Sequence, residues 1–172
     1  MAAYLVSGSA GSGKSTVCHK LIEQGYTAYD TDSYPNFTRL EDMQGNQVPF
    51  PEGTIDWDKY RWNWSEEVFM TKLNQHGNVF FCGVSSNQSD YYKYFDKIFV
   101  LTLDDKTLRH RLLTRTGKDY GKDPKQLEDE IAYRKTRESD LLAQPNAVAI
   151  DSTKPLAKVV DDILSKTQEN ES

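Results

Sequence analysis

Residues 8–15 of this 172-residue chain read Gly-Ser-Ala-Gly-Ser-Gly-Lys-Ser, which matches the spacing G-x-x-x-x-G-K-[ST]. Glycines at these positions let consecutive backbone N–H groups turn towards a bound anion. The apolar run at 2–6 is typical of a strand, and the apolar spacing at 17–22 is typical of a helix. A helix that begins at such a loop adds unpaired N–H groups and a positive dipole end. The order of strand, glycine loop and helix predicts a phosphate-binding loop, or P-loop.

The P-loop predicts a nucleoside triphosphate and a metal ion as ligands. The predicted nucleotide contacts are Gly8, Ser9, Ala10, Gly11, Ser12, Gly13, Lys14, Ser15 and Thr16. We expect Lys14 to be catalytic because its charge can reach the outer phosphates, and Ser15 to bind Mg²⁺ through its hydroxyl. ATP and Mg²⁺ are therefore the expected cofactors. A chance glycine-serine turn is the competing interpretation, and the flanking strand and helix argue against it.

The composition limits the class of protein. The chain has a formal charge of −5 and a pI of about 5.2, which argues against nucleic-acid binding through a basic surface. It contains no apolar run long enough to span a membrane and no secretory signal. Two cysteines in apolar surroundings are typical of reduced thiols in a cytoplasmic protein. We expect a single domain over residues 1–167 and a frayed tail over 168–172, and the sequence leaves the oligomeric state open.

Strand and helix patterns alternate along the chain. The expected strands cover residues 2–6, 26–30, 79–82, 97–103 and 147–150. The expected helices cover residues 58–75, 88–94, 104–116, 125–143 and 155–166. Fully apolar strands of this length are typical of a parallel sheet that is covered on both faces. The order predicts an α/β three-layer sandwich with a five-stranded parallel sheet, and residues 34–55 form a long loop without a period.

Two further motifs indicate which class of P-loop protein this chain resembles. The second strand ends in Tyr29-Asp30-Thr31-Asp32, and the arginine-bearing segment 108–115 is followed by the polar segment 116–125. From residue 2 to about 166, the chain resembles the adenylate kinase and shikimate kinase group of P-loop small-molecule kinases. The resemblance implies a nucleoside/nucleotide kinase-like fold with a short lid at about 116–125 and an acceptor-binding region at about 32–64.

The chain also departs from this group. Shikimate kinases carry a run of glycines after the third strand, whereas this chain has only Gly83 there, which argues against shikimate as the acceptor. The strand at 79–82 lacks the aspartate that many P-loop proteins use for Mg²⁺, so the metal is left to Ser15 and Asp30. The base-reading pattern Asn-Lys-x-Asp of GTPases is absent, which argues against GTP switching.

The resemblance also implies roles for individual residues. Asp30 resembles the carboxylate on the metal side and Asp32 the one on the acceptor side, where it would orient a hydroxyl and take its proton. The two roles could be exchanged, and a pair of aspartates that only bonds nearby backbone is the competing interpretation. Arg115 resembles an arginine near the adenine or the transferred phosphate, and Arg111 is a second candidate for nucleotide binding. Both arginines could instead pair with surface acids at 104–105.

Arg134 shares a face of its predicted helix with apolar residues and with Glu138. A charge on such a face is costly unless it borders a binding site or is fully paired. Arg134 is therefore either a catalytic ligand of the acceptor or the γ-phosphate, as related kinases suggest, or half of a salt bridge with Glu138. The loop after the last strand matches one that passes beside the adenine in adenylate kinases. Its predicted nucleotide contacts are Thr153, Lys154 and Pro155.

The predicted acceptor contacts follow from aromatic and polar residues between 57 and 88. On a helix over 58–75, Arg61 and Trp64 would share an aromatic face that suits a nucleobase. The competing interpretation packs that face against the long loop. Asn87 and Gln88 follow the third strand and could hydrogen-bond the acceptor, or could simply form a polar turn.

These patterns lead to an expected activity. We expect an ATP-dependent phosphotransferase that moves the γ-phosphoryl group to a small molecule. A nucleoside or nucleotide is the first choice of acceptor, and a polyol or sugar acid is the second. The alternative is an ATP-binding regulatory protein with little or no kinase activity.

Overall fold

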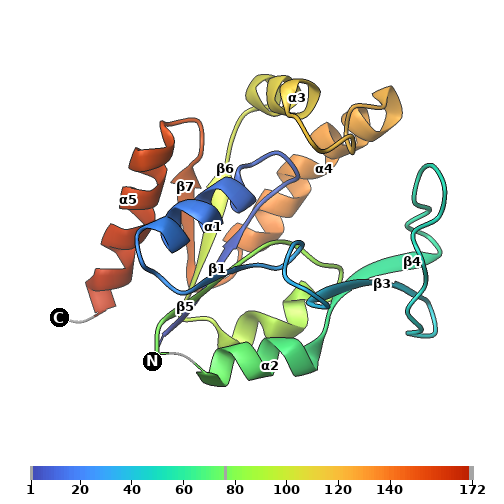
Figure 1. Cartoon of the computed structure of the whole chain (residues 1–172). Helices are drawn as coiled ribbons and strands as arrows, with labels where there is room; N and C mark the ends of the chain where they lie inside the picture. Colours follow the sequence, from blue (N-terminus) through green and yellow to red (C-terminus); the bar gives the residue numbers. More distant parts are fainter. Residues whose placement is uncertain (1, 76, 171–172) are drawn as a thin grey trace.

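The structure is a computed structural model that describes residues 2–75 and 77–170 (Figure 1). Its main sheet has five parallel strands in the order β2-β5-β1-β6-β7, which confirms the predicted fold. The strands are β1 (Ala3–Ser7), β2 (Ala28–Asp30), β5 (Val79–Cys82), β6 (Lys97–Thr102) and β7 (Ala147–Asp151). Because all five are parallel, their carboxyl ends lie at one edge of the sheet, where α/β proteins bind ligands.

Helices cover both faces of this sheet. They are α1 (Lys14–Glu23), α2 (Glu66–Gln75), α3 (Asp105–Thr114), α4 (Pro124–Leu142) and α5 (Leu156–Thr167). The residues at 168–170 form one 3₁₀ turn where we predicted a frayed tail, and 171–172 lie outside the described residues. In the described part of the chain, no helix has the length and apolar character needed to cross a membrane.

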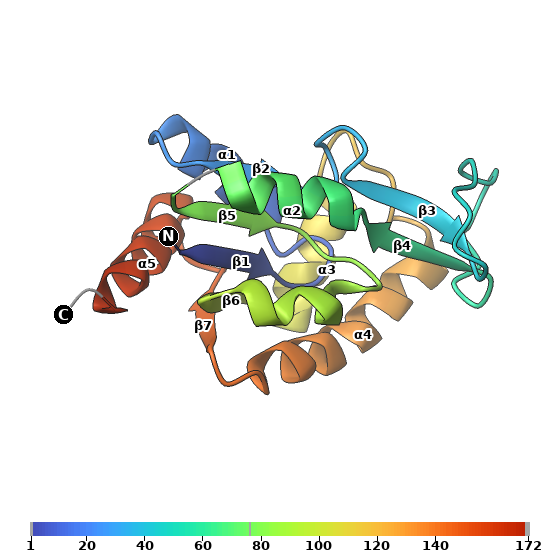
Figure 2. The ribbon, with the colours of Figure 1, turned by 90° about the horizontal axis from the view of Figure 1, so that it is seen from below.

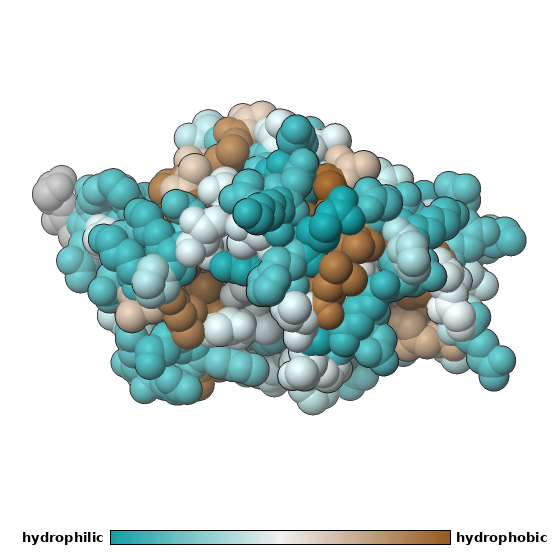
Figure 3. Space-filling view, turned by 90° about the horizontal axis from the view of Figure 1, so that it is seen from above, coloured by the Kyte–Doolittle hydropathy of each residue, from teal (hydrophilic) through white to brown (hydrophobic). Residues whose placement is uncertain are grey.

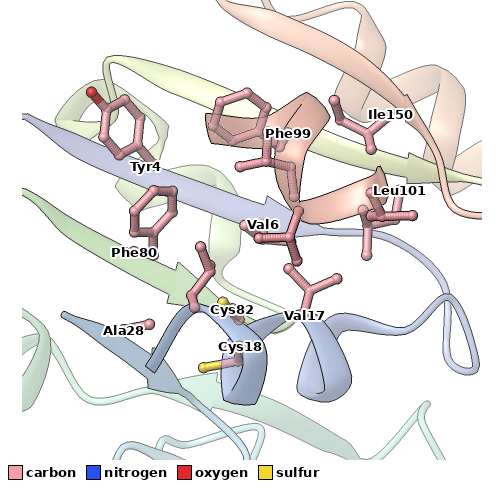
Figure 4. Packing of buried hydrophobic residues seen from close by; sticks show 14 residues of the cluster. Tyr4, Val6, Val17, Cys18, Ala28, Phe80, Cys82, Phe99, Leu101 and Ile150 are labelled. Carbon is pink, nitrogen blue, oxygen red and sulfur yellow. The ribbon is translucent and has the colours of Figure 1, made fainter. Parts of the chain in front are cut away.

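The alternation of side chains along the buried strands divides the core into two layers. Tyr4 and Val6 of β1 point to the layer under α1 and α5, where Cys18 and Cys82 also lie (Figure 4). Leu5 points to the opposite layer, under α2 and α4. Both layers are buried and apolar, which explains why these strands show no polar alternation in the sequence. Seen from above, the outer surface is largely hydrophilic with separate small apolar patches (Figure 3).

A two-stranded hairpin replaces the first part of the predicted helix 58–75. Strand β3 (Thr38–Asp42) pairs with antiparallel β4 (Tyr60–Trp64), so the predicted loop 34–55 also contains a strand. The hairpin projects from the end of the molecule that lies away from both termini (Figures 1 and 2). The prediction was wrong because Tyr-Arg-Trp-Asn-Trp also has a period of two, and aromatic residues favour strands.

The hairpin is attached to the segment that follows β5. The backbone N–H of Ser86 donates to the carbonyl of Trp62 over 2.7 Å, and the Asn87 side chain bonds both backbone groups of Trp64. Just before them, Gly83 lies so close to Thr31 that an added Cβ would be 1.8 Å from the Thr31 hydroxyl oxygen. Only glycine permits this approach, which holds the chain after β2 next to the chain after β5.

Candidate active site

The P-loop connects β1 to α1, and within it the backbone N–H of Ser12 donates to the carbonyl of Ser9 over 3.1 Å. Gly13 directly precedes α1 with φ of 101°, a conformation that side chains with a Cβ rarely adopt. The hydroxyl oxygens of Ser9 and Ser12 are buried and have no hydrogen-bond partner among the described residues. Buried polar atoms without partners are costly, so their presence here fits a site that receives oxygen-rich ligands.

Lys14 lies inside this loop. Its ammonium group donates to the carbonyls of Gly8 and Ser9 over 3.0 and 2.7 Å, and only 9% of the residue is exposed. Burial lowers the pKa of Lys14 to about 8, although the nearby carboxylate of Asp32 favours the charged form. The lysine is thus held at the centre of the loop before any phosphate enters.

The two aspartates after β2 have different surroundings. Asp30 is buried, its Oδ1 accepts from the backbone N–H of Asp32 over 3.1 Å, and its Oδ2 has no partner among the described residues. Asp32 is exposed, and its Oδ1 accepts from the indole N–H of Trp62 on β4 over 3.0 Å. The charge of Asp32 also raises the pKa of Lys14, so the two residues lie in the same region of the molecule.

Asp30 and Ser15 fit the predicted metal site as a minimal pair of oxygen ligands. The free carboxylate oxygen of Asp30 and the half-buried Ser15 hydroxyl are ligand types that Mg²⁺ prefers. Within residues 2–75 and 77–170, no group of three or more His, Cys, Asp or Glu residues could hold a metal by itself. This donor set fits an ion that takes its other ligands from phosphates and water, as Mg²⁺ usually does.

Arg111 fastens the P-loop to the loop after β7. Its guanidinium donates to the carbonyl of Ser12 over 3.2 Å and to the carbonyl of Ser152 over 2.6 Å. The predicted contacts at 153–155 follow directly and are exposed. There, the N–H and hydroxyl of Thr153 bond to Asp151, and Lys154 pairs with Asp162. Arg111 therefore holds this loop beside the P-loop, and the nucleotide contacts at 153–155 stay a prediction.

Arg115 lies where α3 ends. It donates to the carbonyl of Tyr120 in the predicted lid, while its Nε is buried without a partner among the described residues. Burial lowers the pKa of this arginine, although the Glu130 carboxylate favours its charged form. The structure thus places Arg115 between α3 and the lid with a donor still unused.

Arg134 is engaged in ion pairs away from the P-loop. Its guanidinium pairs with Asp105 over 2.7 Å and with Glu138 over 3.2 Å, and it donates to the carbonyl of Leu103 over 2.6 Å. Only 7% of the residue is exposed. Of the two alternatives for Arg134, the structure has the geometry of the salt bridge.

A different arginine of α4 acts on Lys14. The charges of Arg137, of Glu130 and of Lys118 in the lid all act on the pKa of Lys14, so these residues lie in the same region of the molecule. Arg137 and Glu130 are absent from the predicted site because neither interrupts the apolar face of the helix. Their separation of seven residues, two helical turns, was the available signal.

The predicted acceptor contacts are mostly structural. Trp64 is buried in the core against Phe69, which contradicts its predicted place on an aromatic helix face. The Asn87 amide is taken up by backbone, and the buried Gln88 amide bonds Ser7 at the end of β1 over 3.1 Å. Arg61 donates to the carbonyls of residues 57 and 60. The aromatic residue that reaches Asp32 is Trp62, which is not among the predicted acceptor contacts.

A sequence model of the AAA domain family matches residues 5–134, well over half of the chain. The chain belongs to the AAA domain family. No curated protein sequence matches it.

Solved structures share the fold of this AAA domain at low sequence identity. A gluconokinase from Sinorhizobium meliloti superposes with a TM-score of 0.62 at 21% identity, over 95% of this chain and 90% of that one. A deoxyadenosine kinase from M. mycoides gives 0.55 at 15%, over 96% and 98%. A sugar kinase from Janibacter sp. gives 0.53 at 14%, over 96% and 93%. These likenesses establish the P-loop kinase fold.

Replacing Arg134 by alanine is expected to cost the AAA domain stability. The change leaves the half-buried carboxylate of Glu138 and the buried carbonyl of Leu103 without their guanidinium donor, so the free energy of unfolding should fall by roughly 3 kcal/mol. Urea denaturation measures this loss, and Arg109→Ala, which breaks an exposed pair with Glu128, is the control with little change. Unchanged stability together with lost turnover would instead make Arg134 a ligand of the substrates.

Nucleotide affinity is expected to fall in mildly alkaline solution. The pKa of Lys14 is lowered from 10.5 to about 8, so the side chain changes from mostly charged to mostly neutral between about pH 7 and pH 9. Because phosphate oxygens bind the ammonium form, Kd for Mg-ATP should rise by about tenfold over this interval. Calorimetric titration at both pH values checks the affinity, and a constant Kd would contradict the assignment.

The stability of the nucleotide-free protein should rise over the same pH interval. The unfolded chain binds the proton of Lys14 more tightly than the folded chain above pH 8, so the contribution of Lys14 to the free energy of unfolding should rise.

Proposed function

We propose that this protein is a phosphotransferase that moves the γ-phosphoryl group of Mg-ATP to a hydroxyl group of a small molecule. The observation that carries the proposal is the setting of Asp32, whose charge acts on Lys14 while the indole of Trp62 donates to one of its oxygens. The other oxygen is left to orient a hydroxyl and to take its proton as the bond to phosphorus forms. The named kinases with the same fold support this reading.

The protein's own groups would supply most of the charge neutralisation. Lys14 and the P-loop backbone would hold the outer phosphates, and Arg115 and Arg137 would approach the group in transfer. Ser15 and Asp30 would hold Mg²⁺, which when bound supplies further positive charge beside the phosphates. We assign to Arg137 the role predicted for Arg134, because the Arg137 charge acts on the pKa of Lys14, whereas Arg134 is paired with Asp105 and Glu138.

A nucleoside remains our first choice of acceptor. Trp62 lies beside Asp32 and packs against Phe50 at a ring distance of 5.5 Å, and 65% of Phe50 is exposed. Exposed aromatic faces next to the proposed base suit a flat nucleobase. A polyol or sugar acid is the second choice, and the gluconokinase and sugar kinase with this fold keep it open.

The charge of the hairpin favours an acceptor without a phosphate. Residues 32–64 contain six acidic and three basic residues, a net charge of −3. Arg39 pairs with Glu41, Lys59 pairs with Asp56, and Arg61 donates to two carbonyls. A nucleotide or sugar acid would therefore meet excess negative charge here, so we rank a nucleoside above a nucleotide.

A second candidate function is an ATP-binding regulator with little or no kinase activity. The observation that favours it is β5, whose four residues Val-Phe-Phe-Cys include no carboxylate for Mg²⁺. The free and buried cysteines Cys18 and Cys82 support a cytoplasmic setting for either function.

The test is ADP release from Mg-ATP in the presence of separate pools of nucleosides, nucleotides, polyols and sugar acids. Stimulation by one pool supports the kinase, and the nucleoside pool is expected to stimulate most. Absence of stimulation by every pool, combined with an ATP-induced rise in Tm, would favour the regulator. Stimulation by sugar acids alone would keep the kinase and overturn our choice of acceptor.

A further inference from the structure

One short segment contacts both halves of the candidate site. Residues 85–88, which we call the connecting segment, follow the end of β5 and pass beside β4 before the chain turns back (Figure 2). The last residue of the segment contacts the end of β1, directly before the P-loop. Its middle residues contact β4 of the hairpin. The nucleotide side and the acceptor side of the site are therefore joined through this segment.

Gln88 makes the contact with the P-loop. Only 4% of the residue is exposed, and its amide nitrogen donates to the Ser7 hydroxyl over 3.1 Å. Its amide oxygen accepts from the backbone N–H of Ser85 over 3.2 Å. Ser7 is fully buried and directly precedes Gly8, whose carbonyl accepts from the ammonium group of Lys14. Both ends of the buried amide are thus used, and one end holds the residue from which the P-loop starts.

The other end of the connecting segment holds β4 along the edge that faces away from β3. The backbone N–H of Ser86 donates to the Trp62 carbonyl over 2.7 Å, and the Ser86 hydroxyl accepts from the Trp62 N–H over 3.0 Å. The Asn87 amide bonds the N–H and the carbonyl of Trp64 over 2.9 and 3.1 Å. The backbone of Trp62 is thereby fixed, and its indole donates to Asp32 over 3.0 Å.

The topology explains why this segment can hold both parts. The P-loop follows β1 and Asp32 follows β2, and β5 lies between these two strands in the sheet. A segment that leaves β5 can therefore reach the P-loop on one side and the hairpin on the other. Replacing a buried polar pair by an apolar pair of the same shape is often nearly neutral for stability. The directional bonds of Gln88 instead specify one arrangement of the two sides.

We propose, resting on the proposed kinase function, that Gln88 is a positioning residue that sets the spacing between the phosphates held by the P-loop and Asp32. It acts through Ser7 on one side and through Asn87 and Ser86 on the other. In this role its amide stays bonded to the protein and touches neither substrate, which differs from the predicted acceptor contact. The spacing matters because transfer is fast only when the hydroxyl and the phosphorus are held in line at a short distance.

Three variants interrupt the connection at different points. Gln88→Met removes both bonds of the amide and keeps the length of the side chain. Ser7→Ala removes the hydroxyl that the amide holds, and Asn87→Ala releases the backbone of β4. The matched controls are Gln75→Met at the exposed end of α2 and Ser89→Ala on the exposed face of the 3₁₀ helix that begins at Gln88.

Three measurements on the full chain separate alignment from folding and from binding. Urea denaturation gives the folded fraction of each variant. Calorimetric titration gives Kd for a non-hydrolysable ATP analogue with Mg²⁺. ADP release from Mg-ATP, with the acceptor pool that stimulates the wild type most, gives kcat per folded molecule and the apparent KM for that pool.

The expected loss lies in kcat. Gln88→Met should lose about 10² in kcat per folded molecule, because a displacement of about 1 Å is enough for such a loss. Kd for the analogue and the apparent KM should stay within about twofold of the wild type, since both substrates still bind and only their alignment is lost. Asn87→Ala should show the same pattern. Ser7→Ala should lose about tenfold, and the double variant with Gln88→Met should lose no more than Gln88→Met alone, because both act through one contact. Both controls should turn over like the wild type.

Each contrary result has a distinct meaning. Wild-type kcat per folded molecule in Gln88→Met would overturn the positioning role, even if the variant is less stable. A loss in apparent KM alone would make Gln88 an acceptor contact and would also overturn it. If Gln88→Met does not fold, Ser7→Ala decides, and unchanged kcat there overturns the proposal. In all these cases the proposed kinase stands, because the wild type responds to the pool. If no pool stimulates the wild type, the proposed function fails first, and this inference fails with it.

Discussion

Replacement of Lys14 by alanine is expected to abolish the stabilisation of the protein by Mg-ATP. In the wild type, Mg-ATP at about 100 times its Kd should raise the free energy of unfolding by roughly 2.7 kcal/mol. The variant should show no rise at the same concentration, because the buried ammonium group that donates to the carbonyls of Gly8 and Ser9 is the charge placed at the phosphate site. Thermal unfolding with and without Mg-ATP measures the difference.

Lys20→Ala provides the control for this experiment. Lys20 lies on the same helix α1, where it forms a surface pair with Glu23, and its removal should leave the ATP-induced shift intact. Stabilisation of the Lys14 variant by Mg-ATP as large as that of the wild type would contradict the P-loop assignment, and with it the proposed kinase.

Replacement of Asp32 by asparagine is expected to lower kcat by about 10² to 10⁴, the range for loss of a positioned general base. Asparagine keeps an oxygen that accepts from the Trp62 indole, so the hairpin should stay in place and KM for the acceptor should change little. Steady-state ADP release with the acceptor identified from the pools measures both constants.

The matched control for Asp32 is Asp58→Asn, because Asp58 is an exposed aspartate in the turn before β4. It should turn over like the wild type. If Asp32→Asn also keeps the wild-type kcat, the carboxylate is not the base, and the regulatory alternative gains support.

The parts of the fold that rest on short-range rules could be predicted. The glycine spacing and the buried apolar strands are local signals, and they were sufficient for the sheet and for the P-loop. Strand β4 was missed because Tyr60–Trp64 fits both a period of two and the start of an aromatic helix face. Its strand pairs with β3, about 20 residues earlier, and single-sequence patterns do not show such pairing.

The candidate site also has a part that local sequence signals predict and a part that depends on long-range packing. The predicted nucleotide contacts of the P-loop follow from one motif, whereas the acceptor side depends on which face of the hairpin meets Asp32. The arginines of α4 show the difference most clearly. Arg134 was a predicted site residue because it interrupts an apolar helix face, yet in the structure it pairs with Asp105 on another helix. Arg137 looked ordinary, and only the packing of α4 beside the P-loop brings it near Lys14.

The guanidinium of Arg111 spans from Ser12 to Ser152 and so ties two loops that are far apart in the sequence. The two loops at the proposed nucleotide site are therefore already joined without a ligand, so binding of the proposed nucleotide would not have to order them. Preorganisation of this kind lowers the entropic penalty of capture, so more of the interaction energy remains for affinity.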